Sequence, residues 1–391
     1  EPRVRVGGSD CAKPYRASHL NISAMSFGAL SRNAIAALNA GAKLGGFAHN
    51  TGEGGISPHH LEHGGDLVWQ IGTGYFGCRT PDGDFEPEAF GEKADLDAVK
   101  LIEIKLSQGA KPGHGGILPA AKVTREIAEI RGVALGQDVL SPPAHTAFST
   151  PTGLLEFVAR LRELSGGKPV GFKLCIGHRT EFLAICKAMI ATGIRPDFIT
   201  IDGAEGGTGA APVELTNSVG MPLRDGLLFA HNALRGAGLR DEIRIIAAGK
   251  ISTGFHMVRT IALGANLCNA ARAMMFALGC IQARQCNSNE CPVGLATQDP
   301  SRYQGLVVAD KAQRVASYHR QTIHAFLELM AANGHVDAEC ISPNHVQRRV
   351  DATTIKPFSE VYEYLPIGCL LEGSAPEPWL ERWQHARAEL F

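Results

Sequence analysis

Three cysteines stand close together in the stretch GCIQARQCNSNECPVG, namely Cys280, Cys286 and Cys291. Three thiolates on irregular backbone can wrap a soft metal centre, and a proline directly after the last cysteine is typical of iron–sulfur ligand runs. A structural zinc ion normally takes four ligands, and no fourth ligand is evident nearby in the sequence. The spacing therefore favours a three-iron cluster over zinc, with three unrelated thiols as the alternative.

A glycine-rich segment, DGAEGGTGAA (residues 202–211), directly follows the apolar run 198–201. Glycines without a Cβ let the backbone approach a flat or anionic ligand, and successive N–H groups can point at that ligand. The glycine spacing matches neither a Walker loop nor a dinucleotide-binding fingerprint. The segment is thus a candidate ligand loop, and a tight turn is the alternative.

Two further apolar runs end in segments suited to a phosphate, AAGKI at 247–251 and NAARA at 269–273. Loops after the last two strands of a barrel often bind phosphate through backbone N–H groups and a helix N-terminus. Lys250 or Arg272 can add positive charge there. For either residue alone, a solvated cation at the barrel rim is as good an interpretation as a phosphate contact.

Polar side chains also follow two earlier apolar runs. Lys173 ends the run 170–173, and the loop KLSQGAKPGHGG at 105–116 carries Gln108, Lys111 and His114. A lysine at the inner end of a strand points into a barrel mouth, where it can stabilise negative charge on a reduced ring; a rim salt bridge is the alternative. The Gly/Pro-rich loop leaves its side chains free to face a substrate, and an imidazole can shuttle protons.

Short apolar runs alternate with helical patterns, and this alternation predicts the elements that position these residues. The intervening segments 31–44, 153–164 and 181–192 have apolar residues three and four apart, as crossover helices require. A doubly wound sheet is the alternative to a (β/α)8 TIM barrel, but eight strands, with motifs after nearly every one, favour closure. The eight expected strands are 20–23, 46–49, 102–105, 139–141, 170–173, 198–201, 243–248 and 267–270.

No linker, repeat or low-complexity tract divides the chain, so we expect one domain over residues 1–391, with the barrel at about 19–335. Residues 52–91 are Gly-rich and poor in helical pattern, which predicts an insertion over the barrel rim. The cysteine stretch lies in an irregular loop after strand eight. The C-terminal extension, 336–391, is expected to pack on the outside.

Composition excludes several classes of protein. The 391 residues are 45% hydrophobic and have a formal net charge of −1, without the basic footprint that nucleic-acid binding needs. No apolar run is long enough to span a membrane. Ten cysteines are too few for a disulfide scaffold, which favours a reducing, cytoplasmic compartment. The sequence begins with Glu1 and shows no signal-peptide pattern, so a removed N-terminal membrane anchor stays open.

Five segments together resemble the synthase region of the glutamate synthase large subunit: AMSFGALS (24–31), NTGEGG (50–55), the 105–116 loop, DGAEGGTGA (202–210) and the cysteine stretch. They run in order between about residues 20 and 335. The chain is more closely similar to stand-alone, FMN-binding glutamate-synthase-like proteins. The resemblance implies a (β/α)8 barrel with FMN and a [3Fe-4S] cluster, which reduces 2-iminoglutarate, formed from 2-oxoglutarate and ammonia, to L-glutamate.

The same resemblance implies roles for individual residues. Cys280, Cys286 and Cys291 would ligate the cluster. Substrate carboxylates would bind near Ser26, Lys111 and Lys173, which together with His114 are the candidate catalytic residues. The implied FMN contacts are Ala24, Met25, Ser26, Thr51, Gln108, Lys173, Asp202, Gly206, Gly207, Thr208, Gly209, Gly249, Lys250, Ile251, Ala271 and Arg272.

Three departures from the family change the expected partners. There is no N-terminal catalytic cysteine and no amidotransferase domain, so ammonia would come from a separate subunit or another source. The loop at 113–116 reads GHGG where glutamate synthases typically have GEGG, and His114 in place of a carboxylate leaves the 2-oxo acid open. No pyridine-nucleotide fingerprint is present, which implies a separate electron donor, a ferredoxin or a reductase.

We therefore expect a homo- or hetero-oligomeric flavoenzyme in which the cluster passes electrons to FMN and the reduced flavin delivers hydride to an imine. An N-methylglutamate synthase-type subunit, acting on an amine instead of ammonia, is the nearest alternative. An electron-transfer subunit without turnover of its own is another. A flavin-free barrel of the IMP dehydrogenase type is a third, although such a barrel does not require the cysteine stretch.

Overall fold

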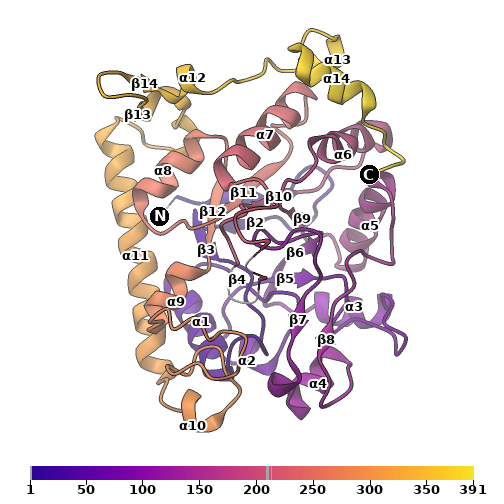
Figure 1. The fold of residues 1–391 in the computed structure, drawn as a ribbon, viewed down its shortest axis with the longest axis vertical. Helices are drawn as coiled ribbons and strands as arrows, with labels where there is room; N and C mark the ends of the chain where they lie inside the picture. The colour runs from indigo at the N-terminus through magenta and orange to yellow at the C-terminus, as the bar shows by residue number, and fades with distance from the viewer. Residues whose placement is uncertain (1, 208–210, 213) are drawn as a thin grey trace.

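The computed structural model describes residues 2–207, 211–212 and 214–391. Its centre is a closed barrel of eight parallel strands in the order β10-β11-β12-β3-β4-β5-β6-β9 (Figure 1). The ring is complete because β12 pairs with β3 and β6 pairs with β9. The barrel strands are β3 (Leu20–Ile22), β4 (His49–Asn50), β5 (Leu67–Ile71), β6 (Val99–Lys105), β9 (Val170–Leu174), β10 (Phe198–Asp202), β11 (Arg244–Ala248) and β12 (Leu267–Ala270).

Closure confirms the predicted (β/α)8 barrel over the doubly wound alternative, but one strand was assigned wrongly. Residues 139–141 are not in the barrel, since β8 (Val139–Leu140) pairs antiparallel with β7 (Ile117–Leu118) in a separate ribbon. The barrel uses β5 instead, inside the stretch predicted to be a rim insertion. All five β5 residues are buried, whereas Leu140 is 66% exposed. Glycines on both sides of β5 made this segment resemble a loop in the sequence. In the structure, those glycines lie in the loops before and after the strand.

The predicted crossover helices are present with nearly the expected bounds. They are α1 (Arg32–Gly45), α5 (Pro151–Leu164) and α6 (Arg179–Thr192). Side-chain caps set the first two starts, because the Ser31 side chain accepts a hydrogen bond from Ala34 N and the Thr150 side chain accepts one from Gly153 N. The other helices up to residue 278 are α2 (Pro58–Leu61), α3 (Pro87–Ala94), α4 (Arg125–Arg131), α7 (Leu223–Gly236), α8 (Gly254–Ala262) and α9 (Arg272–Leu278).

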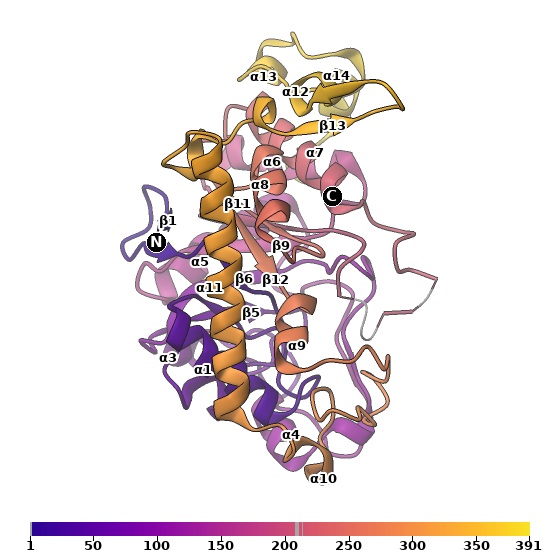
Figure 2. The ribbon, with the colours of Figure 1, turned by 90° about the vertical axis from the view of Figure 1, so that its left-hand side faces the viewer.

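A 25-residue helix, α11 (Val308–Ala332), runs along the outside of the barrel against α1, α8 and α9 (Figure 2). The short α10 (Pro300–Tyr303) precedes it. Residues from 336 onward pack on the outside, at the top of Figure 1, where Asn232 Nδ2 donates to Glu363 O at 2.8 Å. The extension holds β13 (Gln347–Arg349), β14 (Ile355–Pro357), α12 (Phe358–Val361), α13 (Cys369–Glu372) and α14 (Glu377–His385).

The two ends of the barrel differ in chemistry. The N-terminal end is filled by inward apolar side chains such as Val68, Leu101 and Phe198, and the hairpin of β1 (Val4–Val6) and β2 (Tyr15–Ala17) packs over them. The carboxyl ends of the strands carry the loops with polar motifs. As in other barrels of this kind, the functional end is therefore the carboxyl end. None of the helices in the described ranges has the length and apolarity of a membrane span.

Candidate active site

A buried carboxylate lies at the centre of a polar layer inside the barrel, next to the apolar side chains that fill its N-terminal end. Glu103, on β6, is 1% exposed. Its Oε1 accepts hydrogen bonds from Asn50 Nδ2 at 2.8 Å and Gln70 Nε2 at 2.7 Å, and its Oε2 accepts one from Thr200 Oγ1 at 2.6 Å. The donors come from β4, β5 and β10, so this one side chain ties four strands together. Sequence reasoning missed it, although a glutamate within the run LIEI was a usable signal.

Two lysines lie side by side on the next layer toward the mouth, and each has its own carboxylate. Lys105 and Lys173 are register partners on β6 and β9. Lys173 Nζ lies 3.0 Å from Asp202 Oδ2, and Lys105 Nζ lies 3.2 Å from Glu53 Oε2. Burial lowers the pKa of Lys173, but Asp202 and then Glu103 outweigh burial, and the pKa stands above its ordinary value. Lys173 is thus a buried, charged residue of the mouth.

The predicted glycine loop and the 105–116 loop touch each other beside this pair. A Cβ on Gly109 would lie 1.8 Å from Gly203 O, so only glycine permits the approach. Asp202 Oδ2 accepts a hydrogen bond from Gly109 N at 3.0 Å, and Gln108 Nε2 donates to Gly207 O at 3.1 Å. The structure therefore brings Gln108, Asp202 and Gly207 together. Thr208 and Gly209 lie outside the described residues.

The two candidate phosphate loops are neighbours, because β11 and β12 are parallel with Ala248 opposite Asn269. Gly249 has a φ of +153°, which favours glycine, and Ile251 is buried. Lys250 is exposed, and Arg272 begins α9. Beside them, β3 leads into Ala24, Met25 and Ser26, all partly exposed.

Thr51 differs from its neighbours among the implied flavin contacts. Its hydroxyl donates to Gly52 O at 2.9 Å and accepts from Gln70 N at 3.1 Å, and the residue is fully buried. The side chain therefore joins β4 to β5. The backbone N–H of Thr51 also donates within the barrel, to Val68 O at 3.0 Å, so both polar groups are already used.

A second charged group surrounds Glu53, which sequence reasoning did not select. Burial raises the pKa of Glu53, but the positive charges of Lys105 and Arg131 outweigh burial and hold the pKa below its ordinary value. Lys111 is 3% exposed, and burial and then Lys105 lower its pKa. Burial also lowers the pKa of Arg131, to about 10. Three cations surround one carboxylate here, so the excess positive charge favours binding of an anion at the mouth.

Arg131, from α4, connects this group to the loop after β3. One guanidinium nitrogen, Nη2, donates to Phe27 O at 3.0 Å and approaches Ser26 Oγ at 3.4 Å. Ser26 and Lys111 thus lie in one charged neighbourhood. His114 is exposed, and its Nδ1 lies 2.9 Å from Gly115 O. Within the described residues it makes no hydrogen bond to the group around Glu53.

The cysteine stretch is a loop of irregular backbone after α9. Three of the six non-glycine residues with positive φ in the described ranges fall in it, Gln282, Arg284 and Asn289. Cys291 is buried, and Cys280 and Cys286 are partly exposed. Burial, followed by the neighbouring Cys280 and Cys291, raises the pKa of the Cys286 thiol. Among the described residues, no three His, Cys, Asp or Glu side chains are arranged to hold a single metal ion.

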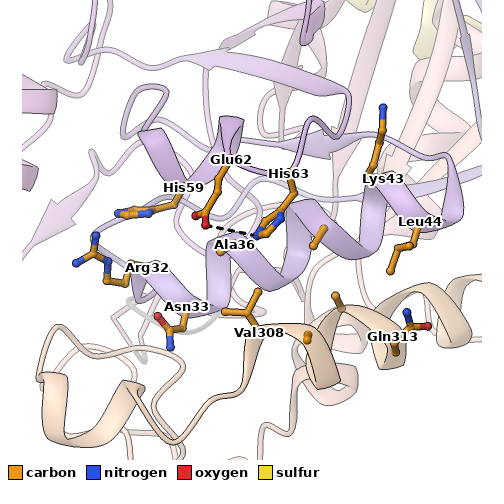
Figure 3. A pocket seen from close by; sticks show the side chains of 13 residues that line it. Arg32, Asn33, Ala36, Lys43, Leu44, His59, Glu62, His63, Val308 and Gln313 are labelled. Carbon is orange, nitrogen blue, oxygen red and sulfur yellow. Dashed lines mark ion pairs between the residues drawn. The ribbon is translucent and has the colours of Figure 1, made fainter.

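A large surface groove lies away from the barrel mouth. A groove of about 700 Å³ lies on the outer surface between α1, α2 and α11 (Figure 3). Ala36 and Val308 line it, and its one ion pair in Figure 3 joins Glu62 and His63, whose Oε1 and Nε2 atoms are 4.0 Å apart. The groove lies outside the barrel and contains none of the charged residues of the mouth. We therefore place the candidate active site at the mouth.

One family model matches most of the chain. Residues 9–336 match the family model described as a conserved region in glutamate synthase. The glutamate synthase large subunit-like protein YerD of Bacillus subtilis (strain 168) is 41% identical over 363 residues, 92% of this chain and 69% of that protein. An archaeal-type NADPH glutamate synthase of Thermotoga neapolitana is 35% identical over 313 residues. The chain covers 58% of that relative's length, and the match spans 80% of this chain.

Solved structures share the fold at low identity. A mutant of an active chimera of (S)-mandelate dehydrogenase has a TM-score of 0.53 and 13% identity, covering 89% of this chain and 87% of that one. A flavocytochrome b2 mutant with pyruvate bound has a TM-score of 0.51 and 12% identity, covering 97% of this chain and 81% of that one. These similarities support the barrel fold.

Proposed function

The chain belongs to the glutamate synthase family, and from this premise we propose that it is an FMN- and iron–sulfur-dependent oxidoreductase that reduces an imine of a 2-oxo acid to an amino acid. The observation that carries the proposal is the pairing of two adjacent lysines with two carboxylates at the barrel mouth, beside two further cations. Such a site can bind an anionic substrate next to a second anionic group.

The loops around the mouth fit a flavin mononucleotide. FMN would lie beside the Gly109–Gly203 contact, where two backbones approach each other with no side chain between them. Its phosphate would be held by the adjacent loops at 249–251 and 271–272. When bound, FMN supplies the hydride chemistry of the reaction. Lys173 would hold a fixed positive charge toward the ring, and Asp202 would orient that lysine through its 3.0 Å ion pair.

The cation excess around Glu53 fits a 2-oxo acid with two carboxylates. Lys105, Lys111 and Arg131 oppose a single carboxylate, which leaves two positive charges uncompensated within this group. His114 adds no negative charge, unlike the glutamate typical of the family. Reduction of an imine also consumes a proton at nitrogen. Lys111, whose pKa burial lowers, is our candidate for the proton donor.

The cysteine loop fits an iron–sulfur cluster better than a single ion. Three thiols of one loop are the soft ligands that iron–sulfur clusters use. A single zinc ion would need its sulfur ligands about 2.3 Å from one point, and the described residues contain no such single-ion arrangement. Cys280, Cys286 and Cys291 would hold a [3Fe-4S] cluster, which would supply single-electron transfer.

The chain spans about two thirds or less of the two relatives above, so its partners are also proposals. We propose that one domain over residues 1–391 works in the cytoplasm, in an oligomer, and receives electrons from a separate ferredoxin or reductase. Ammonia or an amine would come from another subunit or from solution.

An anaerobic preparation tests the proposal. We expect a yellow-brown protein that contains FMN, iron and sulfide, and whose reduced flavin is reoxidised only when 2-oxoglutarate and ammonia are both present, with glutamate detected by mass spectrometry. Methylamine in place of ammonia tests the N-methylglutamate alternative. Lys111→Met tests the proposed proton donor. This variant should keep the flavin and cluster absorption spectrum, and its reduced flavin should no longer be reoxidised by the substrates. A colourless protein, or a coloured one that no pair of 2-oxo acid and amine reoxidises, would contradict the proposal.

A further inference from the structure

We propose that Lys122 is the buried counter-charge of the cysteine loop, a positioning residue that favours the reduced state of the cluster bound there. This inference rests on the proposed function, because it requires the cluster. It concerns a residue that neither the cysteine spacing nor the flavin motifs selected.

The ammonium of Lys122 sits between the cysteine loop and the loop after β3. Lys122 ends the short turn η1 (Ala120–Lys122) and is 1% exposed. Its Nζ donates to Ala29 O at 3.0 Å and to Cys286 O at 2.5 Å. An ammonium has three N–H donors. Among the described residues, two are used by these carbonyls, which leaves one for a group bound between the loops.

Among the described residues, Lys122 has no carboxylate partner, in contrast to the two lysines of the barrel mouth. Lys173 has Asp202 at 3.0 Å, and Lys105 has Glu53 at 3.2 Å. In the part of the chain that the structure describes, no aspartate or glutamate forms an ion pair with Lys122, and the ionisable side chains that act on it are those of Cys286 and Cys291. A buried cation without a counter-charge is costly. An anionic cluster on these thiols would supply the missing charge.

Neutral side chains already tie the same segments together. Asn289 Nδ2 donates to Ala121 O at 3.1 Å, and Gln298 Nε2 donates to Gly28 O and Leu30 O, both at 2.9 Å. Amide donors are therefore sufficient to hold these carbonyls. A positive charge is not needed for that purpose, and a negatively charged ligand at the cysteines would give the charge of Lys122 a partner.

The direction of the effect follows from charge. Reduction adds one negative charge to a cluster, and a nearby buried cation stabilises the more negative state. Removing the charge at 122 should therefore make the cluster harder to reduce. Lys311 offers a matched control, because its Nζ lies 4.0 Å from the Cβ position of Gly279 at the start of the same loop but pairs with Asp310 at 3.0 Å.

The test compares Lys122→Met, Lys122→Arg and Lys311→Met by iron and sulfide content and by a redox titration followed by electron paramagnetic resonance. At the wild-type midpoint potential, we expect at least a tenfold lower ratio of reduced to oxidised cluster in Lys122→Met, which is about 59 mV for one electron. Lys122→Arg and Lys311→Met should stay within about threefold of wild type. A wild-type potential in Lys122→Met at full iron content would overturn the inference.

Loss of the cluster in Lys122→Met is also informative. Iron uptake by Lys122→Arg but not by Lys122→Gln would show that the charge is what the cluster needs. Uptake by both, or by neither, would show a packing requirement and overturn the inference. A wild-type protein that never binds iron or sulfide would instead contradict the proposed function, so the two failures are distinguishable.

Discussion

Lys173 Nζ and Asp202 Oδ2 are 3.0 Å apart at the mouth of the barrel, and both side chains are less than one-tenth exposed. Asp202 also accepts the hydrogen bond from Gly109 N, so the ion pair and the glycine loops form one unit. A ligand at the mouth therefore meets the ion pair and not Lys173 alone. Replacing either residue with a neutral one leaves the charge of the other without its partner.

The first prediction is that Lys173→Met lowers the midpoint potential of the bound flavin by tens of millivolts, since about 30 mV corresponds to 1.4 kcal/mol for a two-electron couple. The loss of the cation leaves Asp202 unpaired near the ring, which opposes the negative charge of reduction. Asp202→Asn should raise the potential, and the double variant should fall between the two. A potential equal to wild type in Lys173→Met at full FMN occupancy would leave the proposed orientation of the ring without support.

The second prediction concerns the cluster ligands. Cys286→Ser should remove most of the iron and sulfide while FMN stays largely bound, because a hydroxyl replaces a thiolate on a soft metal. Cys340→Ser is the control, since Cys340 is exposed and far along the chain from the loop. Circular dichroism should show an intact barrel in both variants. Unchanged iron content in Cys286→Ser would refute the ligand assignment.

The third prediction concerns the phosphate loops. Gly249→Asp should release FMN, because the new carboxylate repels a phosphate held by backbone N–H groups. Crowding contributes as well, since a Cβ at this position would lie 3.1 Å from Leu223 Cβ, and the φ of +153° disfavours any side chain. Gly249→Ala isolates this crowding and should weaken FMN binding less. Equal FMN content in wild type and Gly249→Asp would place the phosphate elsewhere.

The fourth prediction is a loss of stability in mild acid. Burial lowers the pKa of His49 and of His231 to about 3, and that of His145 to about 4, whereas the ordinary pKa of histidine in an unfolded chain is 6.5. As the pH falls below 6.5, the unfolded state binds protons first, so the free energy of unfolding decreases until the folded pKa values are reached. Each tenfold difference in proton affinity between the folded and unfolded chain corresponds to about 1.4 kcal/mol.

His49→Leu should flatten this dependence. Both ring nitrogens of His49 are buried without a hydrogen-bond partner among the described residues, so leucine removes two unpaired polar atoms. Urea denaturation at about pH 7.5 and about pH 5.5, on either side of the ordinary histidine pKa, measures the difference, with exposed His324→Gln as the control. The same pH dependence in wild type and His49→Leu would show that His49 does not contribute.

Local patterns predicted much of the fold and part of the site. The helices α1, α5 and α6 begin within two residues of the predicted starts, because caps and apolar spacing act over one or two turns. The strand β5 was missed because its glycine-rich surroundings are typical of a loop, and only pairing with β4 and β6 identifies it as barrel.

By itself, the sequence determined the alternation of strands and helices, the cysteine spacing and the motifs of the glutamate synthase family. Only the tertiary structure decided which charges meet. Glu53, Lys105 and Arg131 come from three separate segments and converge when the barrel closes. The burial of Glu103 and of Lys122 likewise depends on strands and loops distant in the chain. Electrostatic energy depends on distance and burial in space, and neither is encoded in any local stretch of residues.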